Sequence, residues 1–126
     1  MTTLTASFTV QMAPGDPIPA VPGRFDLTKT WTGEVEGTST GIMLTAGDPG
    51  TGSAGYVAIE TFTGTLGGRQ GTISFQQLGT MAAGEPALTY VIAPGSGTGA
   101  LEGVTGALDI GEIDEEGHHQ VTVELS

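Results

Sequence analysis

Apolar and polar residues alternate along most of this chain of 126 residues, so that side chains two positions apart share a face. In residues 3–12, Leu4, Phe8 and Val10 lie on one face, and the other face carries threonines and a serine. A period of two is typical of a strand with one buried face. No segment carries apolar residues at helical spacing over the length that a helix needs. The alternation therefore predicts an all-β fold.

Glycine and proline clusters divide the alternating chain into eight expected strands. Gly37 is the expected turn between the second and third strands, and Gly67-Gly68 is the expected hairpin turn between the fourth and fifth. The expected strands are residues 3–12, 24–36, 38–46, 54–65, 71–81, 87–93, 107–113 and 118–125. Eight strands joined by turns predict a mostly antiparallel up-and-down barrel, with a sandwich as the alternative. Residues 1–126 have the length of one such β-barrel domain and are too short for two.

Charge and cysteine content exclude several classes of function. The chain has 14 acidic side chains against 3 basic ones, a net charge of −11, so it lacks the basic face that binds nucleic acid or an anionic membrane surface. There is no cysteine, which excludes disulfides, thiolate chemistry and cysteine-type zinc sites. The first residues lack the basic start and apolar run of a signal peptide, so we expect a cytoplasmic protein.

Three segments carry a family resemblance, residues 28–38 (TKTWTGEVEGT), 60–71 (ETFTGTLGGRQG) and 91–106, and His119 matches as well. Together they resemble the bacterial domain-of-unknown-function family 3224. The resemblance implies a calycin-like, eight-stranded barrel like that of the allene oxide cyclases, whose relatives fold or isomerise apolar substrates without an organic cofactor. It implies no established activity. Relatives often carry a histidine where this chain has Gln77, so a site that used that histidine would be altered here.

Lys29 and Glu60 are the first candidates for catalytic residues. Each lies on the face of its strand that also carries aromatic residues, so both are expected to face the barrel interior and to meet there. Burial raises the pKa of a carboxylate and lowers that of a lysine, and pairing opposes both shifts. A glutamate or lysine tuned in this way serves as a general acid or base. The alternative is a structural ion pair at one end of the barrel, and the sequence leaves both open.

His119 shares a face with the apolar residues of the last strand, where it is either a third catalytic candidate that moves a proton or a histidine of the core. The interior of an eight-stranded barrel either fills with side chains or holds one small ligand. The candidate ligand contacts are Trp31, Tyr56, Phe62, Gln77, Tyr90 and Met43. Core packing is the alternative role for these side chains.

Two other motifs predict no site. The run Gly95-Ser96-Gly97-Thr98-Gly99 resembles a phosphate-binding loop, but it lacks the lysine and the helix that such a loop needs. We expect this loop to close one end of the barrel. A cluster of acidic residues and histidines near the end of the chain lacks the ligand spacing of an EF-hand; its members are Glu112, Asp114, Glu115, Glu116, His118 and His119. The sequence therefore predicts no specific metal and no cofactor.

The function predicted from these observations is the binding of a small apolar molecule inside the barrel. One form of it is a cofactor-free cyclase or isomerase that acts on an apolar or polyketide-like substrate, because a pocket that fixes the substrate's conformation supplies much of a cyclisation barrier. The alternatives are a non-catalytic carrier of a lipophilic molecule and a structural module with a filled barrel. Barrels related by the resemblance often associate through their outer faces, which implies a homo-oligomer.

Overall fold

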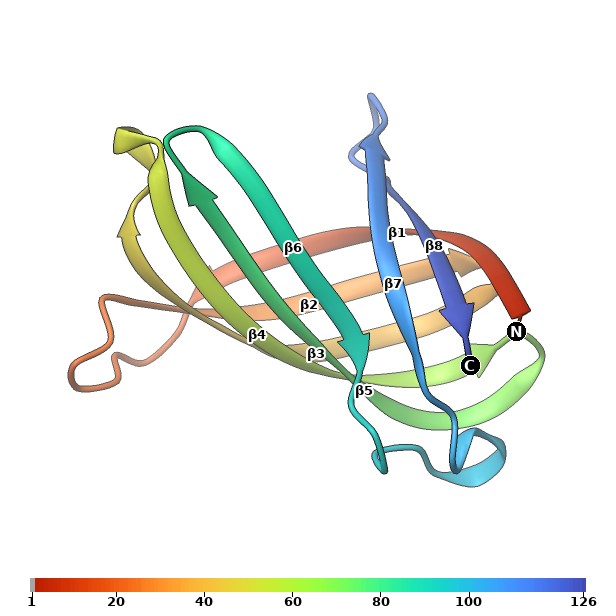
Figure 1. Cartoon of the computed structure of the whole chain (residues 1–126). Coiled ribbons are helices and arrows are strands. Elements are labelled where there is room, and N and C mark those ends of the chain that lie inside the picture. The colour runs from red at the N-terminus through yellow and green to blue at the C-terminus, as the bar shows by residue number, and fades with distance from the viewer. Residues whose placement is uncertain (1) are drawn as a thin grey trace.

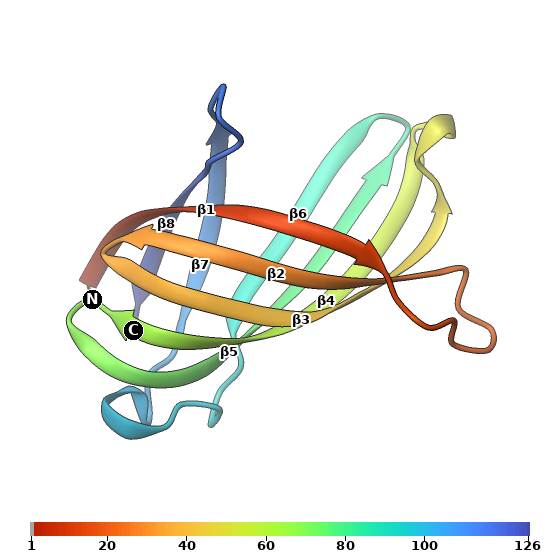
Figure 2. The same ribbon diagram turned by 180° about the vertical axis from the view of Figure 1, so that it is seen from behind.

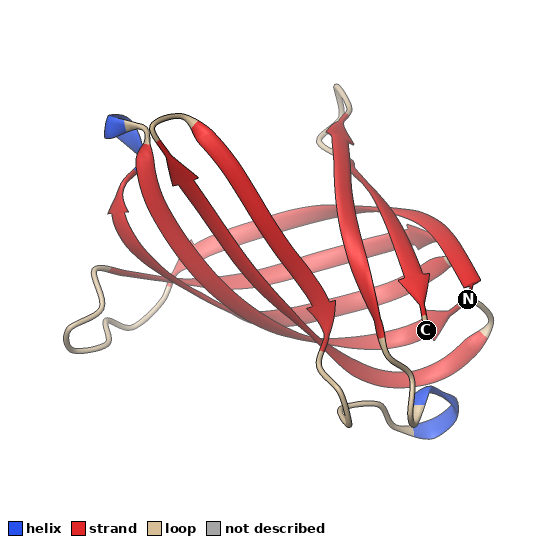
Figure 3. Ribbon diagram, in the orientation of Figure 1, coloured by secondary structure: helices blue, strands red, loops and turns tan. Residues whose placement is uncertain are grey.

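The computed structural model describes residues 2–126, which form eight antiparallel strands closed into a barrel in sequence order (Figure 1). The strands are β1 (Thr2–Pro14), β2 (Gly23–Gly33), β3 (Val35–Asp48), β4 (Ser53–Leu66), β5 (Arg69–Ala82), β6 (Glu85–Ile92), β7 (Gly106–Ile113) and β8 (His119–Leu125). Two short 3-10 helices, η1 (Pro49–Thr51) and η2 (Gly99–Leu101), lie in loops (Figure 3). The predicted all-β barrel is confirmed. None of the described helices is long and apolar enough to cross a membrane.

The turn between β2 and β3 is not where the sequence predicted it. Gly37 lies within β3, and the chain reverses at Glu34 instead, next to Gly33 with a φ of 106°. The Glu34 carboxylate fixes this turn by accepting a 2.7 Å hydrogen bond from the backbone N–H of Thr5. Gly37 serves a different purpose, because a Cβ at this position would collide with the β4 backbone at Thr63. The prediction of a turn at Gly37 was therefore wrong.

One end of the barrel is filled with side chains. At the end that holds both termini, the inward-facing side chains are fully buried and include Phe8, Trp31, Phe62, Leu66, Ile73 and Phe75 (Figure 1). The long loop between β6 and β7 folds under this end and places Leu101 and Val104 in the core. The expectation that the glycine-rich loop closes one end is confirmed.

Two seams of the barrel, β6–β7 and β8–β1, separate toward the opposite end, which we call the open end. Within residues 2–126, β6 and β7 are joined only by the pair of Val91 with Ala107, whereas β5 and β6 pair along the whole of β6. β8 pairs with β1 no further than Phe8. As a result, the tip of the β7–β8 hairpin diverges from the hairpins of β3–β6, as Figures 1 and 2 show from two sides.

Inward-facing side chains at the open end are exposed. Met12 and Ile113 have 52% and 59% of their surface in contact with solvent, and Met81 and Leu88 are also exposed. Met12 shares a face of β1 with Phe8, and Leu88 shares a face of β6 with the buried Tyr90. The inner face of the barrel is therefore packed in one half and accessible in the other.

Candidate functional site

A buried network of three polar side chains lies where the filled half meets the open half. Lys29 Nζ is 2.7 Å from Glu60 Oε2, and the Tyr90 hydroxyl donates a 2.7 Å hydrogen bond to Glu60 Oε1. Lys29 Nζ also donates to the Tyr90 oxygen at 3.1 Å. Lys29 and Glu60 are 4% and 2% exposed. The prediction that these two residues face the interior and pair is confirmed.

The network joins strands β2, β4 and β6, which are not neighbours in the barrel. β3 runs between β2 and β4, and its residue opposite Glu60 is Gly41. A Cβ at Gly41 would collide with the β4 backbone at Ile59 and Glu60, so no other residue fits there without moving a strand. With no side chain on the inner face of β3 at this point, Lys29 can reach across β3 to Glu60.

Aromatic rings and burial set the electrostatics of the network. The Lys29 ammonium lies 4.4 Å from the centroid of the Phe8 ring, a distance at which ring and cation attract. Burial lowers the pKa of Lys29, and the Glu60 carboxylate opposes that change. Burial raises the pKa of Tyr90 well above its ordinary value, and the charge of Glu60 adds to the rise. Tyr90 therefore stays protonated at neutral pH and keeps its hydrogen bond to Glu60.

A second polar pair, Tyr56 and Gln77, lies on the inner face nearer the open end. Gln77 Nε2 donates a 2.6 Å hydrogen bond to the Tyr56 hydroxyl oxygen, and both side chains are half-buried. The Tyr56 ring packs over Gly79, where any Cβ would collide with it. Burial raises the pKa of Tyr56, the hydrogen bond from Gln77 lowers it, and the charge of Glu60 raises it further. Among the described residues, none accepts the Tyr56 hydroxyl proton.

The other candidate ligand contacts divide between the two halves. Met43 is half-buried on the inner face of β3, toward the open end. Trp31 and Phe62 are fully buried in the filled half, with ring centroids 6.2 Å apart, and the Trp31 indole donates to Ser39 Oγ at 3.0 Å. This geometry favours a core role for Trp31 and Phe62, because a ligand could reach them only by displacing packed side chains.

His119 faces inward, as predicted, but it is not part of the network. Its ring stacks on Phe8 with centroids 4.7 Å apart and planes 5° apart. In strand order, Phe8 on β1 lies between His119 on β8 and Lys29 on β2. The Nδ1 atom of His119 is buried without a hydrogen-bond partner among the described residues. The structure thus brings Lys29 and Glu60 together and leaves His119 apart from both.

Some features of this site were not predicted. Tyr90 was expected to contact a ligand, but its hydrogen bonds to Lys29 and Glu60 were not expected. The pairing of Tyr56 with Gln77 was also missed. Alternation placed all of these side chains on the inner face, but it carries no information on which inward residues of distant strands meet.

Two hollows are present, one on the outside of the barrel and one between β6 and β7 that is lined from both faces, including by the inward-facing Leu88 and Tyr90. One, of about 390 Å³, lies on the outer face of β3–β6, and the other, of about 290 Å³, lies along the β6–β7 seam. The first is lined mainly by apolar side chains, among them Ile42, Leu44, Val57, Ile59 and Leu78. A second copy of the chain could pack on this face, and the homo-oligomer stays a prediction.

The acidic tip of the β7–β8 hairpin is held by hydrogen bonds of its own. Asp114 Oδ1 accepts from the backbone N–H groups of Glu116 and His118, which lowers the pKa of Asp114. Within residues 2–126, no group of three or more histidine or acidic side chains is arranged to hold a metal ion.

Comparison with known proteins places the chain in a family. The family model described as "Protein of unknown function (DUF3224)" matches residues 4–125. A solved structure of similar fold is the crystal structure of a protein with unknown function from the DUF3224 family of Shewanella oneidensis MR-1. That protein is 38% identical, with a TM-score of 0.89 over 100% of this chain and 96% of that chain. No curated protein matches the chain. With a family model that spans nearly its whole length, the chain belongs to the DUF3224 family.

Proposed function

We propose that the open end of the barrel binds a small, largely apolar molecule against the inner face, on the open side of the Lys29–Glu60–Tyr90 network. The observation that carries this proposal is that inward-facing side chains change from buried to exposed at the network. On one side Phe62 and Phe75 are fully buried, and on the other side large inward-facing side chains are exposed. A barrel filled from end to end would favour a structural module instead.

The side chains of the exposed inner face suit an apolar ligand. Three of the chain's four methionines, Met12, Met43 and Met81, lie on this face, and Leu88 and Ile113 add branched apolar surface. Methionine is flexible and polarisable, so it adapts to the shape of a bound molecule. Apolar surface gathered on a concave inner wall beside a few polar groups is typical of small-molecule sites.

A test of binding uses the uncharged fluorescent dye Nile red and two matched variants. Leu88 on β6 and Leu78 on β5 are 41% and 49% exposed, but Leu88 faces inward, whereas Leu78 lines the hollow on the outer face of β3–β6. We expect Leu88→Asp to abolish the rise in Nile red fluorescence and Leu78→Asp to leave it unchanged. Loss of the signal in Leu78→Asp alone would place the apolar site on the outer face and contradict the proposal.

The second candidate function is that of a cofactor-free cyclase or isomerase, and the network favours it. Tyr90 and Lys29 hold protons next to the Glu60 carboxylate at a buried position, and general acid–base catalysis uses proton donors and acceptors positioned in this way. Its simplest reaction is removal and return of the proton next to a ligand carbonyl. In heavy water this exchange would replace that proton of a bound ketone with deuterium. We expect the wild type to accelerate the exchange over buffer and Glu60→Gln to show none, which mass spectrometry measures under conditions where circular dichroism shows that the variant, although less stable, is folded.

A further inference from the structure

We infer that the ligand is an uncharged molecule whose apolar frame carries a hydrogen-bond acceptor, such as a ketone or ester carbonyl, and that the Tyr56 hydroxyl is the donor that binds this acceptor. The inference rests on the proposed binding at the open end and names the chemistry of that ligand.

The Tyr56–Gln77 pair supplies a donor that is already oriented. Gln77 Nε2 donates to the Tyr56 oxygen at 2.6 Å, which occupies one lone pair of that oxygen and holds it in place. The hydroxyl proton of Tyr56 is then free for a second partner. Because the Tyr56 ring is packed over Gly79 on the inner face, this hydroxyl stays at a defined position between the buried network and the exposed apolar residues.

The buried network does not offer a competing site for an anion. Lys29 donates to both Glu60 and Tyr90, and its ammonium also lies 4.4 Å from the Phe8 ring centroid. A carboxylate ligand would therefore have to break the ion pair to find a cation. An ionic ligand group left without a partner on an apolar wall is strongly unfavourable.

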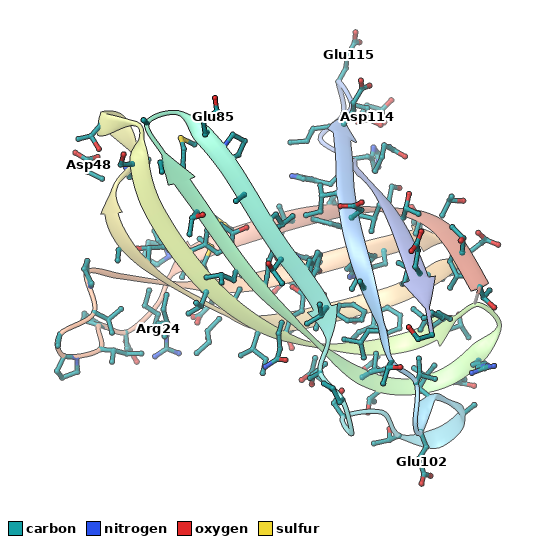
Figure 4. The ribbon with its side chains drawn as sticks, in the orientation of Figure 1. Arg24, Asp48, Glu85, Glu102, Asp114 and Glu115 are labelled. Carbon is teal, nitrogen blue, oxygen red and sulfur yellow. The ribbon has the colours of Figure 1, made fainter. Side chains whose placement is uncertain are left out.

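The remaining charges of the chain also disfavour an anionic ligand. Arg24 is bound to Asp26, Lys29 is paired with Glu60, and Arg69 begins β5 at the filled end, so each of the chain's three cations is either paired with a carboxylate or placed at the other end of the barrel. In Figure 4, the labelled carboxylates Asp48, Glu85, Asp114 and Glu115 lie at the hairpin tips around the open end, and Glu102 lies at the opposite end. This acidic rim repels anions from the inner face.

A pure hydrocarbon would also bind poorly. Its arrival would remove water from the Tyr56 hydroxyl and leave that donor without a partner, which is unfavourable for a buried polar group. A ketone of the same shape replaces the lost water with its carbonyl oxygen. We expect the ketone to bind about tenfold more tightly than the hydrocarbon.

Three naphthalene probes of similar size separate these cases in calorimetric titrations. They are the ketone 2-acetylnaphthalene, the hydrocarbon 2-isopropylnaphthalene and the anion 2-naphthoate. With the wild type we expect the ketone to bind most tightly and naphthoate least. Tyr56→Phe removes only the hydroxyl, so the ketone should bind to it as weakly as the hydrocarbon, whose affinity should be unchanged. The control is Thr89→Val, which removes a hydroxyl from the outer face of β6 and should keep the tenfold preference.

The outcomes distinguish this inference from the proposed function. Equal affinity of the wild type for ketone and hydrocarbon, a preference that survives in Tyr56→Phe, or tightest binding of naphthoate would each overturn the inference and leave binding at the open end intact. If none of the three probes binds to the wild type and Nile red does not bind either, the proposed function and the inference both fail. Should Tyr56→Phe not fold, the preference of the wild type between ketone and hydrocarbon still decides.

Discussion

Lys29 Nζ lies 2.7 Å from Glu60 Oε2 although the two residues belong to β2 and β4, which do not pair with each other. β3 separates these strands, and Gly41 is its residue opposite Glu60. The hydroxyl of Tyr90 extends the contact to β6. The network thus connects three separated strands across the interior through side chains alone, and it marks the limit between the filled and the open halves of the barrel.

Replacing Glu60 by Gln should destabilise the protein strongly. The change leaves the Lys29 ammonium buried without its counter-charge, and breaking a buried ion pair in this way costs about 3–5 kcal/mol in the free energy of unfolding. Urea unfolding followed by the fluorescence of Trp31, the chain's single tryptophan, measures the loss. The control is Glu36→Gln, because Glu36 is exposed and should change stability by less than about 0.5 kcal/mol. Equal effects of the two substitutions would show that the ion pair does not stabilise the fold.

The two tyrosines of the chain should both titrate above their ordinary pKa in the folded protein. Burial raises the pKa of Tyr90 well above that value and raises the pKa of Tyr56 as well. Since the chain has only these two tyrosines, Tyr56→Phe and Tyr90→Phe each leave one to observe. The near-ultraviolet absorbance of the phenolate, followed against pH, should appear at higher pH for Tyr90 than for Tyr56. The reverse order would contradict the buried position of Tyr90.

The raised pKa of Tyr90 also predicts how stability changes with pH. Above pH ~10 the unfolded chain releases the phenol proton while the folded protein keeps it, so the unfolded state binds fewer protons. Stability therefore falls as pH rises through that range, by up to about 1.4 kcal/mol per pH unit for this group. The lowered pKa of Lys29 has the opposite effect on stability. Between that lowered pKa and the ordinary lysine value, the folded protein binds fewer protons than the unfolded chain, so stability rises with pH there. The free energy of unfolding of the wild type should thus fall more steeply above pH ~10 than that of Tyr90→Phe.

The alternation of residues was sufficient to predict the barrel and the inward direction of Lys29 and Glu60. Because successive side chains of a strand point to opposite faces, a face shared with buried aromatic residues is an inner face. The same reasoning failed at Gly37. Glycine is compatible with a turn and also with the close approach of two strands. Only the structure shows that the backbone of β4 passes close to Gly37.

The open end could not be predicted from the pattern. Leu88 and Tyr90 occupy equivalent positions of β6, yet one is exposed and the other is buried. What distinguishes them is how far β6 pairs with β7, and that depends on the register of strands distant in sequence. The partner of Tyr90 in the network depends on the same register, which explains why its contacts with Glu60 and Lys29 were missed.

Replacing Ser39 by Ala should destabilise the filled half of the barrel. Ser39 Oγ accepts the hydrogen bond of the Trp31 indole at 3.0 Å, and both side chains are buried. An indole N–H left without an acceptor in the core costs about 1–3 kcal/mol. The matched control is Ser7→Ala, where the hydroxyl shares an exposed hydrogen bond with Thr32. Chemical unfolding of both variants should show a loss for Ser39→Ala and almost none for Ser7→Ala. Similar losses would mean that the indole hydrogen bond contributes little.

The seam between β6 and β7 should accept an engineered disulfide. Val91 and Ala107 are direct partners on these antiparallel strands, at a separation that a disulfide spans. The chain has no cysteine of its own, so the double variant Val91→Cys, Ala107→Cys forms one intramolecular bond without competing thiols. Closing a loop of this length in the unfolded chain stabilises a fold by about 3 kcal/mol. The reduced double variant is the internal control for the free energy of unfolding.

The oxidised variant also tests where a ligand enters. Val91 and Ala107 lie on the outer side of the seam, apart from the inward-facing Met12 and Leu88 at the open end. If the molecule enters through the open end, oxidation should leave both the affinity for Nile red and its rate of association unchanged while the stability rises. If β6 and β7 must instead separate to admit the molecule, the disulfide should slow association in the oxidised protein and not in the reduced one. Stopped-flow fluorescence of the two forms separates these cases. We expect equal rates, because the pair of Val91 with Ala107 already leaves most of the β6–β7 seam open in the described structure.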